Sequence, residues 1–237
     1  YDQVLGYMYF YRFLREDGPD FALTNTVLNR VIIAVGRRAL PIAILHCNFP
    51  PATSKYPCLL SHKNLRVLFH EFGHCLQQVL TRSPHHNLSG ISQLGRDTGE
   101  FAGQLFEQLS LSEELLQWLS VHYKTRAPLS RTRLTSALAA IATHTSRDTA
   151  TLLLESLLDL ELHRSEENGR NAQSCFEAVL QKIPQLQLPA YCRFANSFDY
   201  LVTGYEASVY AYKWSGVLAS KAFKRFGRDG IFNTQTG

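Results

Sequence analysis

The sequence predicts a mainly helical protein with a small β-sheet. Apolar residues recur at the three- and four-residue spacing of helices between residues 61 and 82, and through most of the chain after residue 100. Two short apolar runs, 27–35 and 41–49, have the length of strands. Of the 237 residues, 45% are hydrophobic and 19% are charged, which is the composition of a globular chain. A disordered or fibrous chain is therefore excluded.

The two strand-like runs lie in the N-terminal third of the chain, after an aromatic and apolar segment at residues 1–15. Residues 27–35 are rich in β-branched side chains, which favour strands. Residues 41–49 end at Pro50 and Pro51, which cannot donate to a strand ladder. We expect the two runs to pair as neighbouring antiparallel strands.

The clearest helical signal begins near Ser61, which with Asn64 is a candidate N-cap. Its apolar residues are Leu65, Leu68, Phe69, Phe72, Leu76, Val79 and Leu80. The same spacing predicts further helices at about 100–121, 130–144, 147–163, 171–182 and 205–227. Residues 83–98 and 184–200 are expected to be irregular. The pattern fits an α+β or mainly-α domain.

Composition also narrows the function class and the compartment. The net charge is only +4, and the Lys and Arg residues form no stripe interleaved with aromatic residues, so nucleic-acid binding is disfavoured. No run of 18 apolar residues occurs, so we expect no membrane span. The five cysteines form no C-x-x-C pair, which favours a reducing compartment and, by default, the cytoplasm. Because the chain starts at Tyr1, we expect a fragment whose targeting information, mitochondrial or other, could lie upstream.

An H-E-x-x-H motif at His70-Glu71-Phe72-Gly73-His74 carries the chemistry. Residues four apart lie one helical turn apart on the same face, so two imidazoles can bind one metal ion at about 2.0–2.1 Å. Glu71 projects beside them and can hold a water at the metal without being a ligand. The alternative is a helix with two hydrogen-bonded histidines and an ordinary surface glutamate.

Two glutamates that follow the motif are candidates to complete such a site. A catalytic zinc commonly has three protein ligands, so His70 and His74 need one more. Glu100 lies near the start of a predicted helix, and Glu107 lies two turns further along the same face. Glu100 could therefore bind the metal while Glu107 accepts a hydrogen bond from a ligand imidazole. Alternatively, both are solvated residues that suit the start of a helix.

A tyrosine-rich segment at 204–214 is the third cluster. Tyr205 and Tyr212 are seven residues apart and share a helix face. A tyrosine hydroxyl can donate to a developing oxyanion in a dry site. The alternative is an aromatic core stripe whose hydroxyls reach the surface.

Together these segments resemble the oligopeptidase A and thimet oligopeptidase family of zinc metallopeptidases. The resemblance touches most of the chain but is thin between residues 130 and 195, and the bacterial oligopeptidase A branch is the most similar. The segments that carry it are Pro41–Phe49, Leu68–His74, Ser89–Ser92, Asp97, Glu100–Glu107, Gly204–Trp214 and Arg225–Asn233. The resemblance implies a zincin-like catalytic region in which one Zn²⁺ is held by His70, His74 and Glu100.

The resemblance further implies that Glu71 is the general base and that Tyr205 and Tyr212 lie near the substrate carbonyl. Family members hydrolyse short peptides in a deep channel between two mostly helical halves. We therefore expect residues 1–237 to be a single catalytic region, truncated at both ends, whose channel is completed by the N-terminal region of the full-length protein. The 41–49 strand is also expected to pair with an extended peptide by strand addition.

One departure from the family pattern leaves an alternative open. Tyr200 falls on the position of an active-site histidine of the family, and Thr203 replaces a glycine. A phenol with a pKa of about 10 cannot replace an imidazole as a proton carrier near neutral pH, although it can donate a hydrogen bond. The alternative is a catalytically impaired, zinc-binding relative that serves as a peptide- or protein-binding module.

Overall fold

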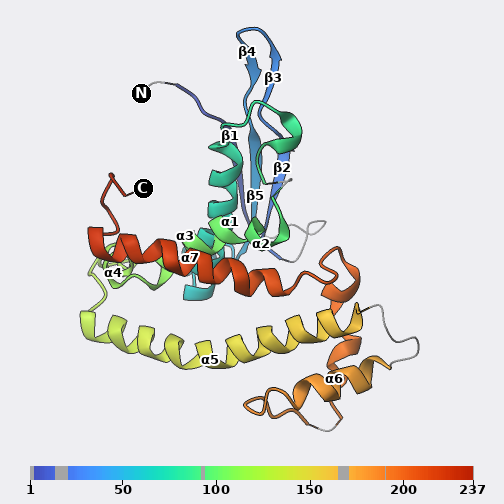
Figure 1. The fold of residues 1–237 in the computed structure, drawn as a ribbon. Coiled ribbons are helices and arrows are strands. Elements are labelled where there is room, and N and C mark those ends of the chain that lie inside the picture. The colour runs from blue at the N-terminus through green and yellow to red at the C-terminus, as the bar shows by residue number, and fades with distance from the viewer. Residues whose placement is uncertain (1–2, 14–20, 92–93, 165–170, 190, 237) are drawn as a thin grey trace. The chain divides into compact units, whose positions relative to one another are not determined.

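The computed structural model describes residues 3–13, 21–91, 94–164, 171–189 and 191–236 and confirms the predicted fold class. Helices make up about 51% of the protein, and a small mixed sheet has three strands (Figure 1). The chain forms two compact units. The first comprises residues 1–131 and 215–237, and the second comprises residues 132–214. None of the described helices is both long enough and apolar enough to span a membrane.

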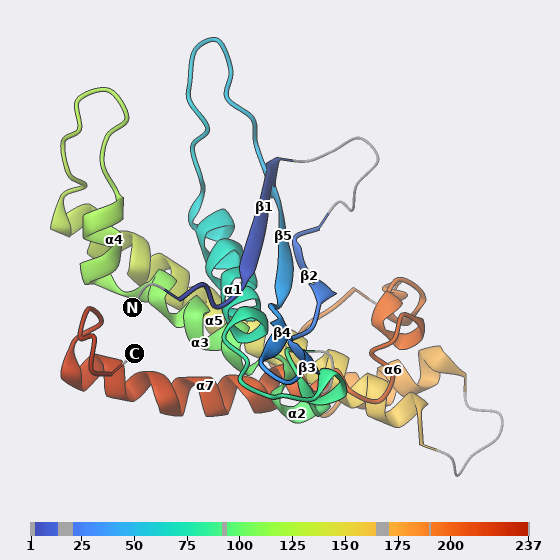
Figure 2. The same ribbon diagram turned by 90° about the horizontal axis from the view of Figure 1, so that it is seen from above.

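The sheet of the first unit has the order β1-β5-β2, as Figure 2 shows. Its strands are β1 (Tyr7–Phe13), β2 (Leu23–Leu28) and β5 (Ile42–Phe49). β1 is parallel to β5, whereas β2 is antiparallel to it. A separate hairpin is formed by β3 (Val31–Ala34) and β4 (Arg37–Ala39). The predicted strand at 41–49 is thus confirmed over all but its first residue.

The core of the first unit lies between β5 and helix α1 (His62–Val79). Side chains alternate across a strand, and every second residue of β5 is 0–4% exposed. These four residues are Ala43, Leu45, Cys47 and Phe49. They pack with Cys75 and Val79 of α1. Ser61 is the N-cap of α1, because its hydroxyl accepts from the Asn64 N–H, and the Asn64 side chain accepts in return from the Ser61 N–H.

Two expectations about the strands are wrong. β5 is the central strand of its sheet, so both of its edges are already paired and it cannot accept a peptide by strand addition. The run 27–35 is not one strand, because it is interrupted at Asn29 and Arg30. The Asn29 side chain donates to the carbonyl of His86 and accepts from Gln78, and Arg30 donates to the carbonyl of Thr81. These contacts take the chain away from β5, so only β2 is its antiparallel neighbour.

The predicted helix at 100–121 is broken into several pieces in the first unit. They are α3 (Phe101–Glu107), a 3₁₀ turn (Gln108–Leu111) and α4 (Glu113–Leu119). The break is explained by Ser112, whose hydroxyl accepts from the Leu115 N–H and starts a new helix. The region 83–98, expected to be irregular, also contains a 3₁₀ turn (His86–Leu88) and the short helix α2 (Arg96–Gly99).

The second unit is built on α5 (Arg131–Leu162), of which all but the first residue belongs to it. The expected helices 130–144 and 147–163 are one continuous helix. The intervening Thr145 is helical, and its hydroxyl donates to the carbonyl of Ile141 one turn earlier. Apolar residues of α5 pack with α6 (Ala172–Leu180) and the segment that follows it. The buried core residues are Ala150, Leu154, Leu158, Cys175, Phe176, Val179, Ile183, Phe198 and Val209.

Helix α7 (Tyr210–Asp229) begins in the second unit, and its residues from Ser215 belong to the first. It starts five residues later than expected. Ala207 has a positive φ of 53°, which a helix does not allow. The buried carboxylate of Asp159 accepts from the N–H groups of Ala207 and Val209 at 2.9 and 3.0 Å, and so holds the turn before the helix. Within the first unit, the Ser215 hydroxyl donates to the carbonyl of Asp97 in α2.

Candidate metal centre

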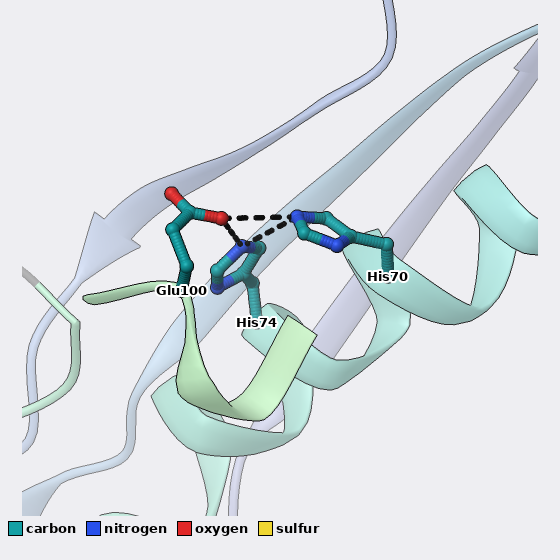
Figure 3. Close-up of side chains that lie close together, drawn as sticks. All are labelled: His70, His74 and Glu100. Atoms are coloured by element: carbon teal, nitrogen blue, oxygen red, sulfur yellow. Dashed lines mark hydrogen bonds and ion pairs between the residues drawn. The ribbon is translucent and has the colours of Figure 1, made fainter. Parts of the chain in front are cut away.

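His70 and His74 lie one turn apart on α1 and present their rings to the same point (Figure 3). Their Nε2 atoms are 3.1 Å apart, and the ring planes are steeply inclined to each other at 78°. The helical period alone explains this proximity, because residues four apart are neighbours on one face.

Glu100 brings a carboxylate to the two rings from the residue that precedes α3. Its Oε2 lies 3.1 Å from Nε2 of His70 and 3.4 Å from Nε2 of His74 (Figure 3). The approach requires α1 and α3 to lie very close together. A Cβ placed on Gly73 would lie 2.3 Å from the carbonyl oxygen of Ala102, and one placed on Gly103 would lie 2.7 Å from Nε2 of His74. Glycine at these two positions therefore makes the site possible.

The three donor atoms fit a tetrahedral metal ion. Ligands at about 2.0–2.1 Å from a tetrahedral zinc lie about 3.3–3.4 Å from one another. The three separations here are 3.1, 3.1 and 3.4 Å. In the described part of the chain, this is the one group of three such side chains whose ligand atoms converge. Two imidazoles and one carboxylate are also a donor set that suits zinc and leaves a fourth position open.

Glu107, the last residue of α3, forms a hydrogen bond with Nδ1 of His70, the ring nitrogen that does not face His74 and Glu100. Its Oε2 lies 3.1 Å from Nδ1 of His70, and its Oε1 accepts from Nε of Arg66. A carboxylate only accepts, so Nδ1 of His70 carries the proton. In neutral His70 the lone pair therefore belongs to Nε2, the atom that faces His74 and Glu100.

Glu100 and Glu107 change the pKa of His70, and His70 in turn changes the pKa of both carboxyl groups. Burial alone would lower the pKa of His70, but its hydrogen bonds to Glu100 and Glu107 raise it to about 10. Burial would raise the pKa of Glu100, but hydrogen bonds to His70 and His74 lower it to about 2. The pKa of Glu107 is also lowered, against the effect of burial, by His70 and Arg66. The two carboxylates therefore favour the protonated form of His70, so a metal ion that binds Nε2 has to displace a proton there.

Glu71 is buried, with 9% of its surface exposed, and it contacts β2. The Thr24 hydroxyl lies 2.9 Å from both Oε2 and the backbone carbonyl of Glu71. Cys75 Sγ is 3.6 Å from the same hydroxyl. Burial raises the pKa of Cys75 to about 11 and that of Cys47 to about 12, so both remain neutral thiols in the core.

The three candidate tyrosines gather in the second unit. Ring centroids of Tyr200 and Tyr205 are 4.9 Å apart, and those of Tyr205 and Tyr212 are 6.0 Å apart. Tyr200 also meets Tyr212 edge-on at 6.2 Å. The second unit thus brings these tyrosines together, as the first unit brings together the two histidines with Glu100 and Glu107.

Sequence reasoning missed three residues that shape the centre. Gly103 lies against both imidazoles. It follows Glu100 by three residues, and a single glycine at that position does not by itself predict such a contact. Arg66 lies one helical turn before His70 and donates to Glu107, but a basic residue at that spacing is no signal of such a contact. Thr24 is 47 residues from Glu71 in the chain, and no local pattern connects the two.

Two histidines one turn apart on α1, with a carboxylate from the residue that precedes α3, have the arrangement of a metallopeptidase centre. The comparison with known proteins agrees, because the family model of Peptidase family M3 matches residues 1–237. The chain belongs to this peptidase family. The family assignment confirms the resemblance noted from the sequence.

Similar proteins include several oligopeptidases. The chain is 32% identical over 239 residues to oligopeptidase A of Escherichia coli (strain K12), covering 100% of this chain and 35% of that protein. It is 30% identical over 236 residues to the probable cytosolic oligopeptidase A of Arabidopsis thaliana, covering 95% of this chain and 33% of the relative. It is 27% identical over 242 residues to the thimet-like oligopeptidase of Dictyostelium discoideum, with 100% and 35% covered. The chain thus spans about a third of the length of these relatives.

Proposed function

We propose that the protein is a zinc-dependent endopeptidase that hydrolyses short peptides. His70, His74 and Glu100 hold one Zn²⁺ in this proposal. The triangle of 3.1–3.4 Å between their donor atoms is the observation that carries it. Membership of a peptidase family supports the reaction class, and the oligopeptidase names of the relatives support short peptides as substrates.

In the proposed mechanism, the ion and the residues around it have separate roles in hydrolysis. The ion would supply Lewis-acid activation of a water and of the scissile carbonyl. Glu71 takes a proton from the attacking water onto its carboxylate and later passes it to the leaving amine. Glu107 keeps the proton of His70 on Nδ1, which leaves Nε2 to bind the metal.

The proposal also gives a role to the three candidate tyrosines. Tyr212, together with Tyr205, donates hydrogen bonds to the oxyanion that develops on the substrate carbonyl. Tyr200 stands at the family's histidine position and acts as a hydrogen-bond donor rather than a proton carrier near neutral pH. Mutual packing of the three rings supports a common role.

The proposal extends to the full-length protein and its location in the cell. Because residues 1–237 hold the candidate metal site and span about 35% of the bacterial relative, we propose that they belong to the catalytic region and that the N-terminal region of the full protein completes the substrate channel. A cytoplasmic location is proposed from the plant relative named cytosolic. A second Arabidopsis thaliana relative is named chloroplastic/mitochondrial, which makes an organelle the alternative location.

Glu71→Gln tests the function. We expect the full-length variant to retain about one zinc per chain, measured by elemental analysis, but to lose hydrolysis of a quenched fluorogenic peptide by at least about 10³-fold. Glu114→Gln, an exposed position on α4, is the matched control and should leave both measurements unchanged. Peptide hydrolysis that survives in Glu71→Gln would contradict the mechanism. If the wild type binds one zinc per chain but does not hydrolyse the peptide, the proposed peptidase activity is contradicted. The result would instead indicate a non-catalytic, zinc-binding module that binds peptides or proteins.

A further inference from the structure

The hydroxyl of Thr24, a residue of the sheet, contacts the Glu71 carboxylate. Thr24 lies on β2 and is paired with Leu45 of β5. Leu45 points into the core between β5 and α1, so the side chain of Thr24 points to the same side of the sheet. The sheet therefore presents a hydroxyl to α1 at the level of Glu71.

Neighbouring threonines of β2 contact different residues of α1. Thr24 donates to Oε2 of Glu71, and Thr26 donates to Oε1 of Gln78 at 3.1 Å. The two threonines are two residues apart in a strand and thus on one face of it, and their partners are seven residues apart on one face of the helix. The contacts are alike in chemistry, but only that of Thr24 reaches the H-E-x-x-H motif. This makes Thr26 an internal control.

The hydroxyl of Thr24 has one proton, which two oxygens of Glu71 share. This hydroxyl lies 2.9 Å from Oε2 and 2.9 Å from the backbone carbonyl of the same residue. The contact ties the carboxylate to its own backbone, so rotation about the side-chain bonds is restricted. Such a hold matters to a general base, because a misplacement of about 1 Å can reduce a rate about 10²-fold.

We propose that Thr24 is a positioning residue that orients the Glu71 carboxylate for proton transfer. The inference rests on the proposed function, in which Glu71 is the general base. Thr24 acts through Glu71 and supplies no ligand to the metal.

Hydroxyl removal at matched positions tests the proposal in the full-length, zinc-loaded protein. Thr24→Val removes the hydroxyl at nearly constant shape, Thr24→Ser keeps it, and Thr26→Val is the control on the same face of the same strand. We expect Thr24→Val to lower kcat for a quenched peptide about 10- to 100-fold, with KM changed less than about 3-fold. Thr24→Ser should remain within about 3-fold of wild type, and Thr26→Val should retain the wild-type kcat.

Two measurements are independent of turnover. Elemental analysis should show the same zinc content in Thr24→Val as in wild type. A crystal structure of Thr24→Val should show the Glu71 carboxylate displaced or in more than one conformer, whereas Thr26→Val should show it unchanged. If Thr24→Val fails to fold, Thr24→Ala removes the same hydroxyl and replaces it in every measurement.

Several outcomes would overturn the proposal. Wild-type kcat in Thr24→Val, or an equal loss of kcat in Thr24→Val and Thr26→Val, would show that the hydroxyl has no specific effect on Glu71. An unmoved Glu71 carboxylate in the Thr24→Val structure would do the same. Failure of the proposed function can be told apart from failure of this inference. In the first case the wild type would show no Glu71-dependent hydrolysis, whereas the crystal structures would still report whether Thr24 orients Glu71.

Discussion

Gly103→Ala offers the sharpest test of the metal centre, because the site has no room for a methyl group. The added Cβ would lie 2.7 Å from Nε2 of His74 and 2.9 Å from Nε2 of His70. Ordinary contacts of a Cβ with side-chain atoms are 3.4–4 Å. The rings or α3 must therefore move apart by roughly half an ångström, whereas metal–ligand distances tolerate only about 0.2 Å.

That displacement determines how much zinc affinity we expect Gly103→Ala to lose. We expect Gly103→Ala to weaken zinc binding about 10- to 100-fold, the range found when groups that support a ligand are removed. This corresponds to about 1.4–2.8 kcal/mol of binding free energy. Competition with a chromophoric chelator measures the zinc Kd of the full-length protein.

The matched control is Gly99→Ala, which adds the same methyl group just before Glu100. A Cβ there meets nothing within 4 Å, so the zinc Kd should stay within about 2-fold of wild type. A Gly103→Ala protein that binds zinc as tightly as wild type would refute the reasoning. It would show that the rings do not hold the metal in the positions described.

Two further predictions concern pH and the second unit. Because the pKa of His70 is raised to about 10 in the metal-free site, zinc must displace a proton from it, and zinc affinity should rise about tenfold per pH unit between pH 6 and 8. Titration calorimetry in buffers of different ionisation enthalpy measures the proton release, and a pH-independent affinity would contradict the assignment. Asp159→Ala should lower the free energy of unfolding by about 2–5 kcal/mol, because the N–H groups of Ala207 and Val209 lose a buried charged acceptor. Urea denaturation measures this loss, and a change no larger than that of Asp148→Ala, an exposed position on α5, would count against it.

Local spacing explains what could be predicted at the metal centre. The helical period places His70 beside His74 whatever the rest of the chain does. The same period relates Glu100 to Glu107, which contact different nitrogens of His70 in the structure. The spacing could not show that α3 lies against α1. The need for a third ligand made Glu100 a candidate, and the family resemblance implied the same residue.

Strand partners depend on contacts that are distant in sequence. The run 41–49 was identified from its composition, yet its central place between β1 and β2 was not, because strand order depends on long-range pairing. Helix ends were missed for a related reason. Ser112 starts α4 by a local cap, whereas α7 starts late because Asp159, some 50 residues away, holds the preceding turn.

The sequence by itself determined the residue types of the candidate site, their order and their helical phase, because these follow from backbone geometry within a few residues. Tertiary structure alone decided that Thr24 reaches Glu71 and that Gly103 lies under both imidazoles. Such contacts arise only when separate elements pack at a particular distance and register. No periodicity within one element encodes that distance, since it is set by the side chains of both partners at the point where they meet.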